Sequence, residues 1–400
     1  MRKPERGTAR EPVTTNVAIM GAGPAGLMLS HLLATQGIES TVVEIRSRQE
    51  IQETVRAGIL EHGTVKLLVD SGASDRVLQE GHRHDGIVLR FEGENHRIRF
   101  DELVGESVWL YPQTDVFMDL AARRELDDGD VRYGVSETTV HDLEERPKIW
   151  FTDSEGRRFE IQADFLVGAD GSRSQCRLEI PESSRTWYFH EYPFAWFGIL
   201  AEAPRSLDVL MYVNSEHGFA LLSQRTDTVQ RMYFQCHISE RADDWDDERI
   251  WTEFRRRVNG NGFELNEGPV LEKMVLPFRS FVHTPMRYGN LFLAGDAAHT
   301  VPPTGAKGLN LAIQDVKVLF EGFESFYSSG STELLDSYTE RALERVWKAQ
   351  HFSYWMTSML HTAPGSDDFE RGRQLGELNS LVSSHHAQAY LAECYTGWPT

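Results

Sequence analysis

The first apolar segment of the chain predicts a strand, a tight turn and a helix. Residues 16–20 are rich in strand-forming side chains, and three glycines follow within six positions. Leucines then recur at mostly helical spacing from residue 27 to residue 33, and we expect this helix to stop at Gly37. Residues 40–44 form a second strand pattern. A strand, a helix and a strand in this order predict a βαβ unit and a parallel sheet.

Later segments predict a second sheet and a return to the first. Residues 86–108 look like alternating strands, and residues 148–161 look like a hairpin that turns at 154–156. The segment 192–232 is rich in aromatic and β-branched residues, which favours a mostly antiparallel sheet. An apolar strand follows at 291–294, and the last 80 residues read mostly as helix.

These patterns predict an α/β protein with interleaved parts. We expect a Rossmann-like dinucleotide-binding domain, an α+β second domain built on the antiparallel sheet, and a helical C-terminal region. The expected limits are a flexible extension 1–15, a dinucleotide-binding domain 16–186 that lends strands near 86–108 to the second sheet, a sheet domain 187–280, a return 281–330, and a helical interface region 331–400.

Composition narrows the class of protein. Of the 400 residues, 40% are hydrophobic and 26% are charged, and no apolar run approaches the ~20 residues of a membrane span. The net charge of −20 argues against nucleic acid and anionic membranes as partners. An anionic substrate would need cations at its own site. Cys176, Cys236 and Cys394 show no metal-ligand spacing and are expected to be thiols in a reducing cytoplasm.

The Gly-rich turn carries the first candidate chemistry. In Gly21-x-Gly23-x-x-Gly26 the first glycine permits a tight turn and the second lets the backbone approach a phosphate. The third lets the helix pack on the strand. Glu44 closes the second strand, where a carboxylate can bind an adenosine ribose. The turn therefore predicts a dinucleotide, with Ala25 among its contacts, although it does not separate FAD from NAD. A Gly-rich turn without a ligand is the alternative.

Two more segments resemble motifs of the single-component flavin-dependent aromatic hydroxylases. Residues 291–299 (LFLAGDAAH), with the loop 302–310 (PPTGAKGLN), resemble the family's second FAD motif, and residues 165–174 (FLVGADGSRS) resemble its third. The three motifs occur in the family's order, about 145 and 125 residues apart. The resemblance implies FAD as the cofactor. It also implies that Asp296 binds the ribityl chain and that Asp170 serves both FAD and the nicotinamide nucleotide.

The resemblance runs from about residue 17 to residue 399 and is strongest to members that hydroxylate 4-hydroxybenzoate at carbon 3. It implies that NAD(P)H reduces the flavin and that O2 then forms a flavin hydroperoxide. This species transfers oxygen to a small aromatic acid in aromatic catabolism. Further matches are residues 56–61, 192–196, 218–225, 347–350, 355–358 and 395–399.

The same resemblance assigns the substrate site. Arg225 matches the clamp on the substrate carboxylate. Tyr212 matches the partner of the 4-hydroxyl, Tyr395 the next member of the proton chain, and His84 its outer end, where a pKa near 6.5 suits exchange with solvent. Other substrate contacts are implied at Ser223, Gln224, Tyr233 and the Pro303 carbonyl, which faces the phenol.

Further FAD contacts are implied by position. Arg231 matches the cation that helps the isoalloxazine ring to move. The others are Thr54, Arg56, Ala57, Gly58, Ile59, Gln113, Leu309 and Asn310. Each assigned residue also has an ordinary structural alternative: a strand arginine can be solvated, a histidine can lie in a polar loop, and a tyrosine can be a core residue with a satisfied hydroxyl.

The segment 45–54 matches the family least well. Thr54 stands where the best-known members have an arginine, and Ile45 replaces another of their residues. Arg46 and Arg48 can pair with a 2′-phosphate, whereas the acidic residues nearby would repel one. We therefore expect mixed use of NADH and NADPH, with contacts to this nucleotide at Arg46, Arg48, Arg173, Arg177 and Arg279.

Two alternatives to this function remain. One is hydroxylation of a close analogue such as 4-aminobenzoate or 3,4-dihydroxybenzoate. The other is a non-catalytic flavin-binding redox sensor, against which the set of Tyr212, Arg225 and Tyr395 argues. The resemblance also suggests a homodimer, with its contact in the helical C-terminal region.

Overall fold

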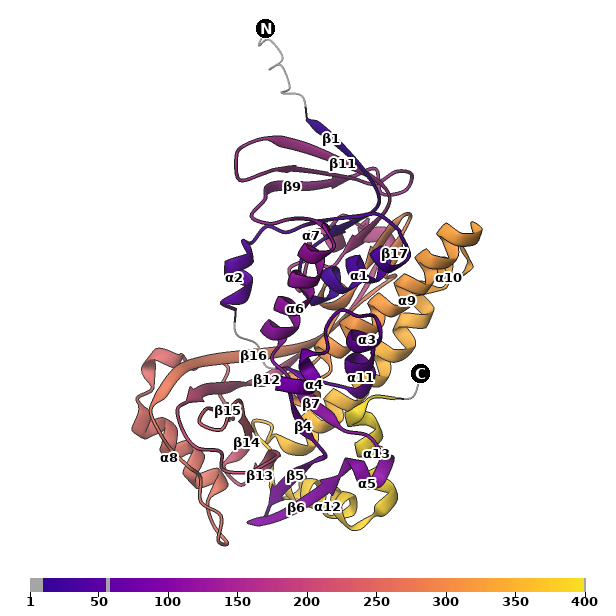
Figure 1. Cartoon of the computed structure of the whole chain (residues 1–400). Helices are drawn as coiled ribbons and strands as arrows, with labels where there is room; N and C mark the ends of the chain where they lie inside the picture. Colours follow the sequence, from indigo (N-terminus) through magenta and orange to yellow (C-terminus); the bar gives the residue numbers. More distant parts are fainter. Residues whose placement is uncertain (1–9, 55–57, 399–400) are drawn as a thin grey trace.

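The computed structural model describes residues 10–54 and 58–398 and contains two large sheets accompanied by helices (Figure 1). The first sheet lies at the upper end of Figure 1 and the second at the lower end, with the long helices α9 (Gly308–Ser329) and α11 (Tyr338–Leu360) beside them. The first sheet has the order β17 (Arg287–Tyr288), β18 (Leu291–Leu293), β11 (Arg158–Gly168), β1 (Glu11–Met20), β2 (Ser40–Val43) and β8 (Asp130–Arg132), and β10 (Lys148–Thr152) pairs with β11 and with β9 (Ser136–His141).

The predicted βαβ unit is confirmed. Strand β1 pairs in parallel with β2 and β11, and Val17–Met20 are all buried, as in a strand covered on both faces. Helix α1 (Pro24–Thr35) follows the Gly-rich turn and ends just before Gly37, whose φ is +68°. The predicted hairpin is the antiparallel pair β10–β11, and β18 returns in parallel to β11.

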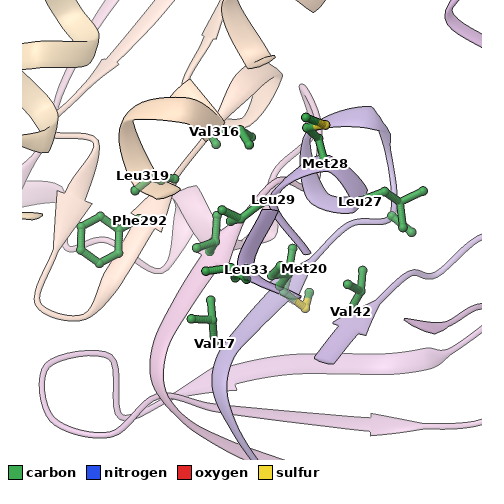
Figure 2. Packing of buried hydrophobic residues seen from close by; sticks show 14 of the residues in the cluster. Val17, Met20, Leu27, Met28, Leu29, Leu33, Val42, Phe292, Val316 and Leu319 are labelled. Carbon is green, nitrogen blue, oxygen red and sulfur yellow. The ribbon is translucent and has the colours of Figure 1, made fainter. Parts of the chain in front are cut away.

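The core of this domain lies between the sheet and its helices. Figure 2 shows side chains of α1 and α9 beside those of β1 and β18, with Leu29, Leu33 and Leu319 near Val17 and Phe292. All five side chains are fully buried. Since α1 begins directly after the turn, this packing fixes the helix N-terminus beside the carboxyl end of β1, where the turn lies.

The predicted flexible extension 1–15 is wrong at its inner end. Residues 1–9 lie outside the described part, but β1 already begins at Glu11. Its pairing with β11 runs from Glu11 opposite Phe159 to Thr15 opposite Ala163. The polar sequence suggested an extension, but the 11-residue strand β11 provides backbone partners for the whole segment. Composition could not reveal this partner.

The second sheet is mostly antiparallel, as predicted. Helix α8 (Asp247–Val258) covers one face with an apolar cluster, and the C-terminal helices cover the other. Only the pair β13–β5 is parallel among its described pairings. The order is β19 (His299–Thr300), β16 (Val270–Thr284), β12 (Thr186–Ala201), β15 (Gln230–Cys236), β14 (Gly218–Gln224), β13 (Leu210–Ser215), β5 (Gly86–Phe91) and β6 (Glu94–Arg99).

The predicted interleaving is also present. Strands β5 and β6 join the second sheet before the chain returns to β8 of the first. The predicted limits 187 and 280 fall inside paired stretches of β12 and β16. In the predicted strand region 86–108, helix α5 (Phe100–Val104) comes before β7 (Val108–Leu110). A small third sheet orders β3 (Ile59–Leu60), β7 and β4 (His82–His84).

The remaining α-helices of the described residues range from 4 to 16 residues in length. They are α2 (Arg48–Gln52), α3 (His62–Asp70), α4 (Arg76–Glu80), α6 (Gln113–Leu126), α7 (Gln175–Leu178), α10 (Glu333–Asp336), α12 (Asp368–Ser383) and α13 (His385–Thr396). None of the helices in the described ranges combines the length and apolarity needed to cross a membrane.

Candidate active site

The three glycines of the Gly-rich turn have different surroundings. Gly21 has φ +104°, and a Cβ there would lie 2.3 Å from the Ala169 carbonyl oxygen. A Cβ on Gly26 would lie 2.0 Å from the Gly21 oxygen, so the helix packs directly on the turn. At Gly23 no heavy atom lies within 4 Å of an added Cβ. Gly23 is the N-cap residue of α1, and an open helix N-terminus favours a phosphate.

Glu44 lies buried at the end of β2, beside this turn. Its Oε2 accepts a hydrogen bond of 2.9 Å from the Ala22 amide, and its Oε1 accepts one of 2.9 Å from the Arg46 amide. The Arg46 Nε also donates to Oε1 at 3.3 Å. The backbone therefore holds the carboxylate in place at the position predicted for a ribose contact.

The basic residues predicted to meet a nicotinamide nucleotide already have protein partners in several cases. Arg46 pairs with Glu44, and Arg48 lies 2.9 Å from Glu125. Arg173 and Arg279 are exposed, and the Arg279 guanidinium lies 5.9 Å from the Phe189 ring.

Arg177 joins two of the flavin motifs through hydrogen bonds. Its Nη2 donates to the Ser172 carbonyl at 2.8 Å, and its Nη1 donates to the Ala297 carbonyl at 2.7 Å. The side chain is buried, and burial lowers the pKa of its guanidinium. These bonds fix the loop after β11 to the loop after β18, and a contact of Arg177 with the nicotinamide nucleotide stays a prediction.

Asp170 supplies an oxygen that can meet a ligand. Its Oδ2 accepts hydrogen bonds from the Gln175 amide at 2.7 Å and the Cys176 amide at 3.1 Å. Its Oδ1 is buried and has no hydrogen-bond partner in the described structure. A Cβ built on Gly21 would lie 3.0 Å from the Asp170 amide, so this residue lies beside the dinucleotide turn. Buried polar atoms normally have partners, so an orphaned carboxylate oxygen there fits a bound cofactor. FAD is compatible with this set of groups.

The start of α9 is tied to β3 and to the residue after β3 by two side chains, those of Asn310 and Lys307. The Asn310 amide nitrogen donates to the Ile59 carbonyl at 2.8 Å, and its oxygen accepts from the Glu61 amide at 2.9 Å. Lys307 forms a buried ion pair of 2.7 Å with Glu61 and donates to the Tyr395 carbonyl at 3.1 Å. Sequence reasoning missed this pair, since only the Gly/Pro character of the loop gave a signal.

The other predicted flavin contacts are distributed over several elements or lie outside the described residues. Arg56 and Ala57 belong to the latter group. Gly58 packs against β7, where an added Cβ would lie 1.9 Å from the Tyr111 oxygen. Leu309 is in the first turn of α9 and Gln113 in the first turn of α6, whereas the Thr54 hydroxyl donates to the Glu50 carbonyl at 2.8 Å.

Two tyrosines meet where the second sheet faces the C-terminal helices. The hydroxyls of Tyr212 on β13 and Tyr395 on α13 are 2.6 Å apart, and both side chains are 1% exposed. The Tyr212 hydroxyl also lies 3.3 Å from the Thr304 carbonyl, next to Pro303. Burial raises the pKa of both tyrosines well above 10, so both are protonated at neutral pH.

Arg225 and Arg231 supply positive charge on the same face of the sheet. Ser223 lies opposite Arg231, and the alternation of β14 places residue 225 on the face of residues 221 and 223. The Arg225 guanidinium forms no hydrogen bond or ion pair with the described residues, and Asp115 and Glu272 influence its pKa only through longer-range charge. Burial and the nearby Arg231 lower the pKa of Arg225. Arg231 Nη1 lies 3.5 Å from the Tyr233 hydroxyl. These two arginines provide the local positive charge that an anionic substrate needs in a protein with a net charge of −20.

His84 does not extend the tyrosine pair directly. Its Nε2 lies 3.0 Å from the Gln224 side-chain nitrogen, which also donates to the Asp208 carbonyl at 3.1 Å. In the described residues no direct hydrogen bond joins His84 to Tyr395. Burial lowers the pKa of His84 to about 4, so the expected pKa near 6.5 is wrong for this conformation. The Gln224 amide is committed to these partners.

The Pro303 carbonyl accepts a hydrogen bond of 3.0 Å from the Ala306 amide, in the 3-10 helix Pro303–Gly305. A carbonyl oxygen has two lone pairs, so one acceptor position is left for a substrate hydroxyl. The arrangement as a whole joins a dinucleotide cradle to a buried face with two hydroxyls and two guanidinium groups.

Comparison with known proteins gives a consistent result. The family described as "FAD binding domain" matches residues 14–353. The chain is 41% identical over 391 residues to the p-hydroxybenzoate hydroxylase of Acinetobacter baylyi, covering 97% of this chain and 96% of that protein. It is 28% identical over 322 residues to a 3-(3-hydroxy-phenyl)propionate/3-hydroxycinnamic acid hydroxylase of Mycobacterium sp. (strain JLS), covering 77% of this chain and 53% of that protein.

A solved structure confirms the fold. The p-nitrophenol 4-monooxygenase of Pseudomonas putida DLL-E4 superposes with a TM-score of 0.81, over 98% of this chain and all of that chain. The two sequences are 19% identical, so this likeness concerns the fold alone.

Proposed function

This chain belongs to the FAD binding domain family and is an FAD-dependent aromatic monooxygenase, and from that premise we propose that it hydroxylates 4-hydroxybenzoate at carbon 3. The product is 3,4-dihydroxybenzoate, and the co-substrates are O2 and NADH or NADPH. The relative that is 41% identical carries the name of this activity and matches over nearly the whole of both chains.

The observation that carries the proposal is the buried hydroxyl pair of Tyr212 and Tyr395 on the same sheet face as Arg225, whose guanidinium forms no hydrogen bond or ion pair with the described residues. A planar guanidinium suits bidentate pairing with a carboxylate. The hydroxyl pair suits a phenol at the opposite end of a benzoate ring. A redox sensor has no need of such a pair, and 4-aminobenzoate would not place a phenol proton on it.

The chain's own residues bind, orient and deprotonate the substrate. Arg225 holds the carboxylate, with the Ser223 and Tyr233 hydroxyls as additional donors. Tyr212 accepts the phenol proton as it passes its own proton to Tyr395, and Tyr395 releases its hydroxyl proton in turn towards solvent, so neither tyrosine becomes a buried anion. The ionised phenol directs electron density to the carbon ortho to its oxygen. The bound flavin supplies the redox chemistry that activates O2, and exclusion of water protects that chemistry.

We propose mixed use of NADH and NADPH. Arg46 and Arg48 are each paired with a carboxylate, which weakens their electrostatic attraction for a 2′-phosphate without abolishing it. Turnover measured with each nucleotide tests this, and a strict preference for NADPH would contradict it.

We also propose a homodimer with its contact at the C-terminal helices. Trp347 and Tyr354 on α11 are 44% and 51% exposed, and Tyr188 of β12 stacks edge-on against Trp347 with ring centroids 5.2 Å apart. Exposed aromatic clusters are typical of protein interfaces. Sedimentation of the purified protein gives its mass, and a monomer at micromolar concentration would contradict the proposal.

The central experiment is a comparison of NAD(P)H oxidation with and without 4-hydroxybenzoate, with chromatography of the product. We expect stimulation by the acid and formation of 3,4-dihydroxybenzoate. Peroxide as the sole product, or no stimulation, would refute the function. Arg225→Gln should raise the KM for the acid about 10- to 100-fold, because it removes a charged hydrogen-bond donor. Arg205→Gln, which affects an exposed arginine paired with Asp227, is the matched control.

A further inference from the structure

Asp315 is a buried carboxylate in the middle of α9, and both of its described partners are in the loop after β18. Its Oδ2 accepts a hydrogen bond of 2.8 Å from the Gly295 amide and lies 2.6 Å from His299 Nε2. The Asp315 and His299 side chains are 3% and 2% exposed. Gly295 and His299 stand on either side of Asp296, the residue that the second flavin motif assigns to the ribityl chain.

The loop is held at alternate positions along its length. The Tyr338 hydroxyl donates to the Leu293 carbonyl at 2.7 Å, and Asp315 takes the amide of residue 295. Arg177 donates to the Ala297 carbonyl at 2.7 Å, and the His299 ring contacts Asp315. The backbone of these positions is thus fixed by side chains from three separate segments before any ligand is considered.

A buried carboxylate is unfavourable unless donors compensate for the lost water. The neighbours of Asp315 on α9 include Ile313, Val316 and Leu319, which are fully buried apolar residues. An apolar side chain would therefore suit simple packing at this position. Instead, one oxygen of Asp315 spans two points of the flavin loop, and the loop lies close enough that a Cβ on Gly295 would be 3.0 Å from the Ala312 Cβ.

We propose that Asp315, with His299 as its partner, is a positioning residue for FAD: it fixes the 295–299 loop so that Asp296 is presented to the ribityl chain. Asp315 acts through the loop and not by touching the cofactor. The proposal rests on the proposed function only in taking FAD as the ligand. It predicts that the loss of this carboxylate weakens flavin binding by a folded protein.

The test measures FAD affinity of the apoprotein by quenching of flavin fluorescence, well below the unfolding temperature of each variant. Asp315→Ala loses both interactions and should bind FAD about 10- to 100-fold more weakly. Asp315→Asn keeps an oxygen for the Gly295 amide but loses the charged contact with His299, so it should recover only about threefold of that loss and still bind FAD more weakly than the unmodified protein. Gln314→Ala changes the adjacent buried residue on the same helix, has no partner in the loop, and should bind FAD like the unmodified protein.

The visible absorption band of the bound flavin provides a second readout, since a displaced loop changes the environment of the ring. Wild-type affinity and spectrum in folded Asp315→Ala would overturn the proposal, as would an equal loss in Gln314→Ala. If Asp315→Ala does not fold, Asp315→Asn decides, and wild-type affinity there would overturn the proposal. The unmodified protein separates the two claims: if it binds no FAD, the proposed function fails, whereas normal turnover with an unaffected Asp315 variant removes only the positioning role.

Discussion

The three glycines of the dinucleotide turn should respond differently to the same added methyl group. Gly26→Ala places a Cβ 2.0 Å from a backbone oxygen, far inside the distances that real Cβ atoms adopt. Gly21→Ala meets an oxygen at 2.3 Å and also forces alanine to a φ of +104°. Gly23 has φ −70° and ψ 177°, which alanine adopts freely, and no heavy atom lies within 4 Å of its added Cβ.

These contacts set the expected magnitudes. Overpacking against backbone costs about 1–3 kcal/mol, so Gly26→Ala should lose about 3 kcal/mol of stability, because a backbone oxygen cannot turn aside. Gly21→Ala should lose stability from its own close contact and about 1–2 kcal/mol more than that contact costs, because alanine is strained at a left-handed φ. Gly23→Ala should change the stability of the apoprotein by less than about 1 kcal/mol. Its methyl group would occupy the space of the pyrophosphate and remove hydrogen bonds to a charged group, which weakens FAD binding about 10- to 100-fold.

The assay separates the two effects. Thermal unfolding of the apoproteins, followed by tryptophan fluorescence, reports the fold, and quenching of flavin fluorescence reports FAD binding. Gly23→Ala should unfold at the temperature of the unmodified apoprotein and still bind FAD poorly. The reasoning is refuted if Gly23→Ala destabilises the apoprotein as much as Gly26→Ala, or if it binds FAD with unchanged affinity.

Two further predictions concern buried titratable groups. Tyr395→Phe removes the 2.6 Å partner of Tyr212, so bound 4-hydroxybenzoate should ionise less and kcat should fall about 10- to 100-fold, with little change in the Kd of the acid. A difference spectrum of the bound phenolate measures this, and an unchanged spectrum would count against the relay. Burial lowers the pKa of His84 and His283 to about 4 and that of His361 to about 3. Each binds its proton more weakly when folded, so stability is full above the unfolded pKa of about 6.5 and falls as the pH drops below it. At pH 5 each histidine should cost about 2 kcal/mol. Unfolding temperatures between pH 7 and pH 5 test this, and a constant value would contradict it.

Much of the first domain could be predicted because its signals are local. The Gly21–Gly26 turn, α1 and β2 follow from backbone requirements and hydrophobic spacing within about 25 residues. The three flavin motifs are also short segments, and their order identified the family. The polar start of the chain was misjudged, because the partner of Glu11–Thr15 is β11, more than 140 residues later.

For the substrate face, one expectation from the sequence was correct and one was wrong. The resemblance named Tyr212 and Tyr395, which lie 183 residues apart in sequence and meet in the structure. It also named His84 as a group that titrates near neutrality. Burial, not residue type, decides that property, and here it lowers the pKa to about 4.

The sequence by itself determined the dinucleotide turn, the βαβ unit, the family and the residue types of the site. Only the tertiary structure decided which charges are committed: Arg177 to the loops of two motifs, Lys307 to Glu61, and Asp315 to His299. The reason is physical. Periodicity and turn chemistry act between neighbours in the chain, whereas desolvation and ion pairing depend on which distant segments exclude water from a side chain.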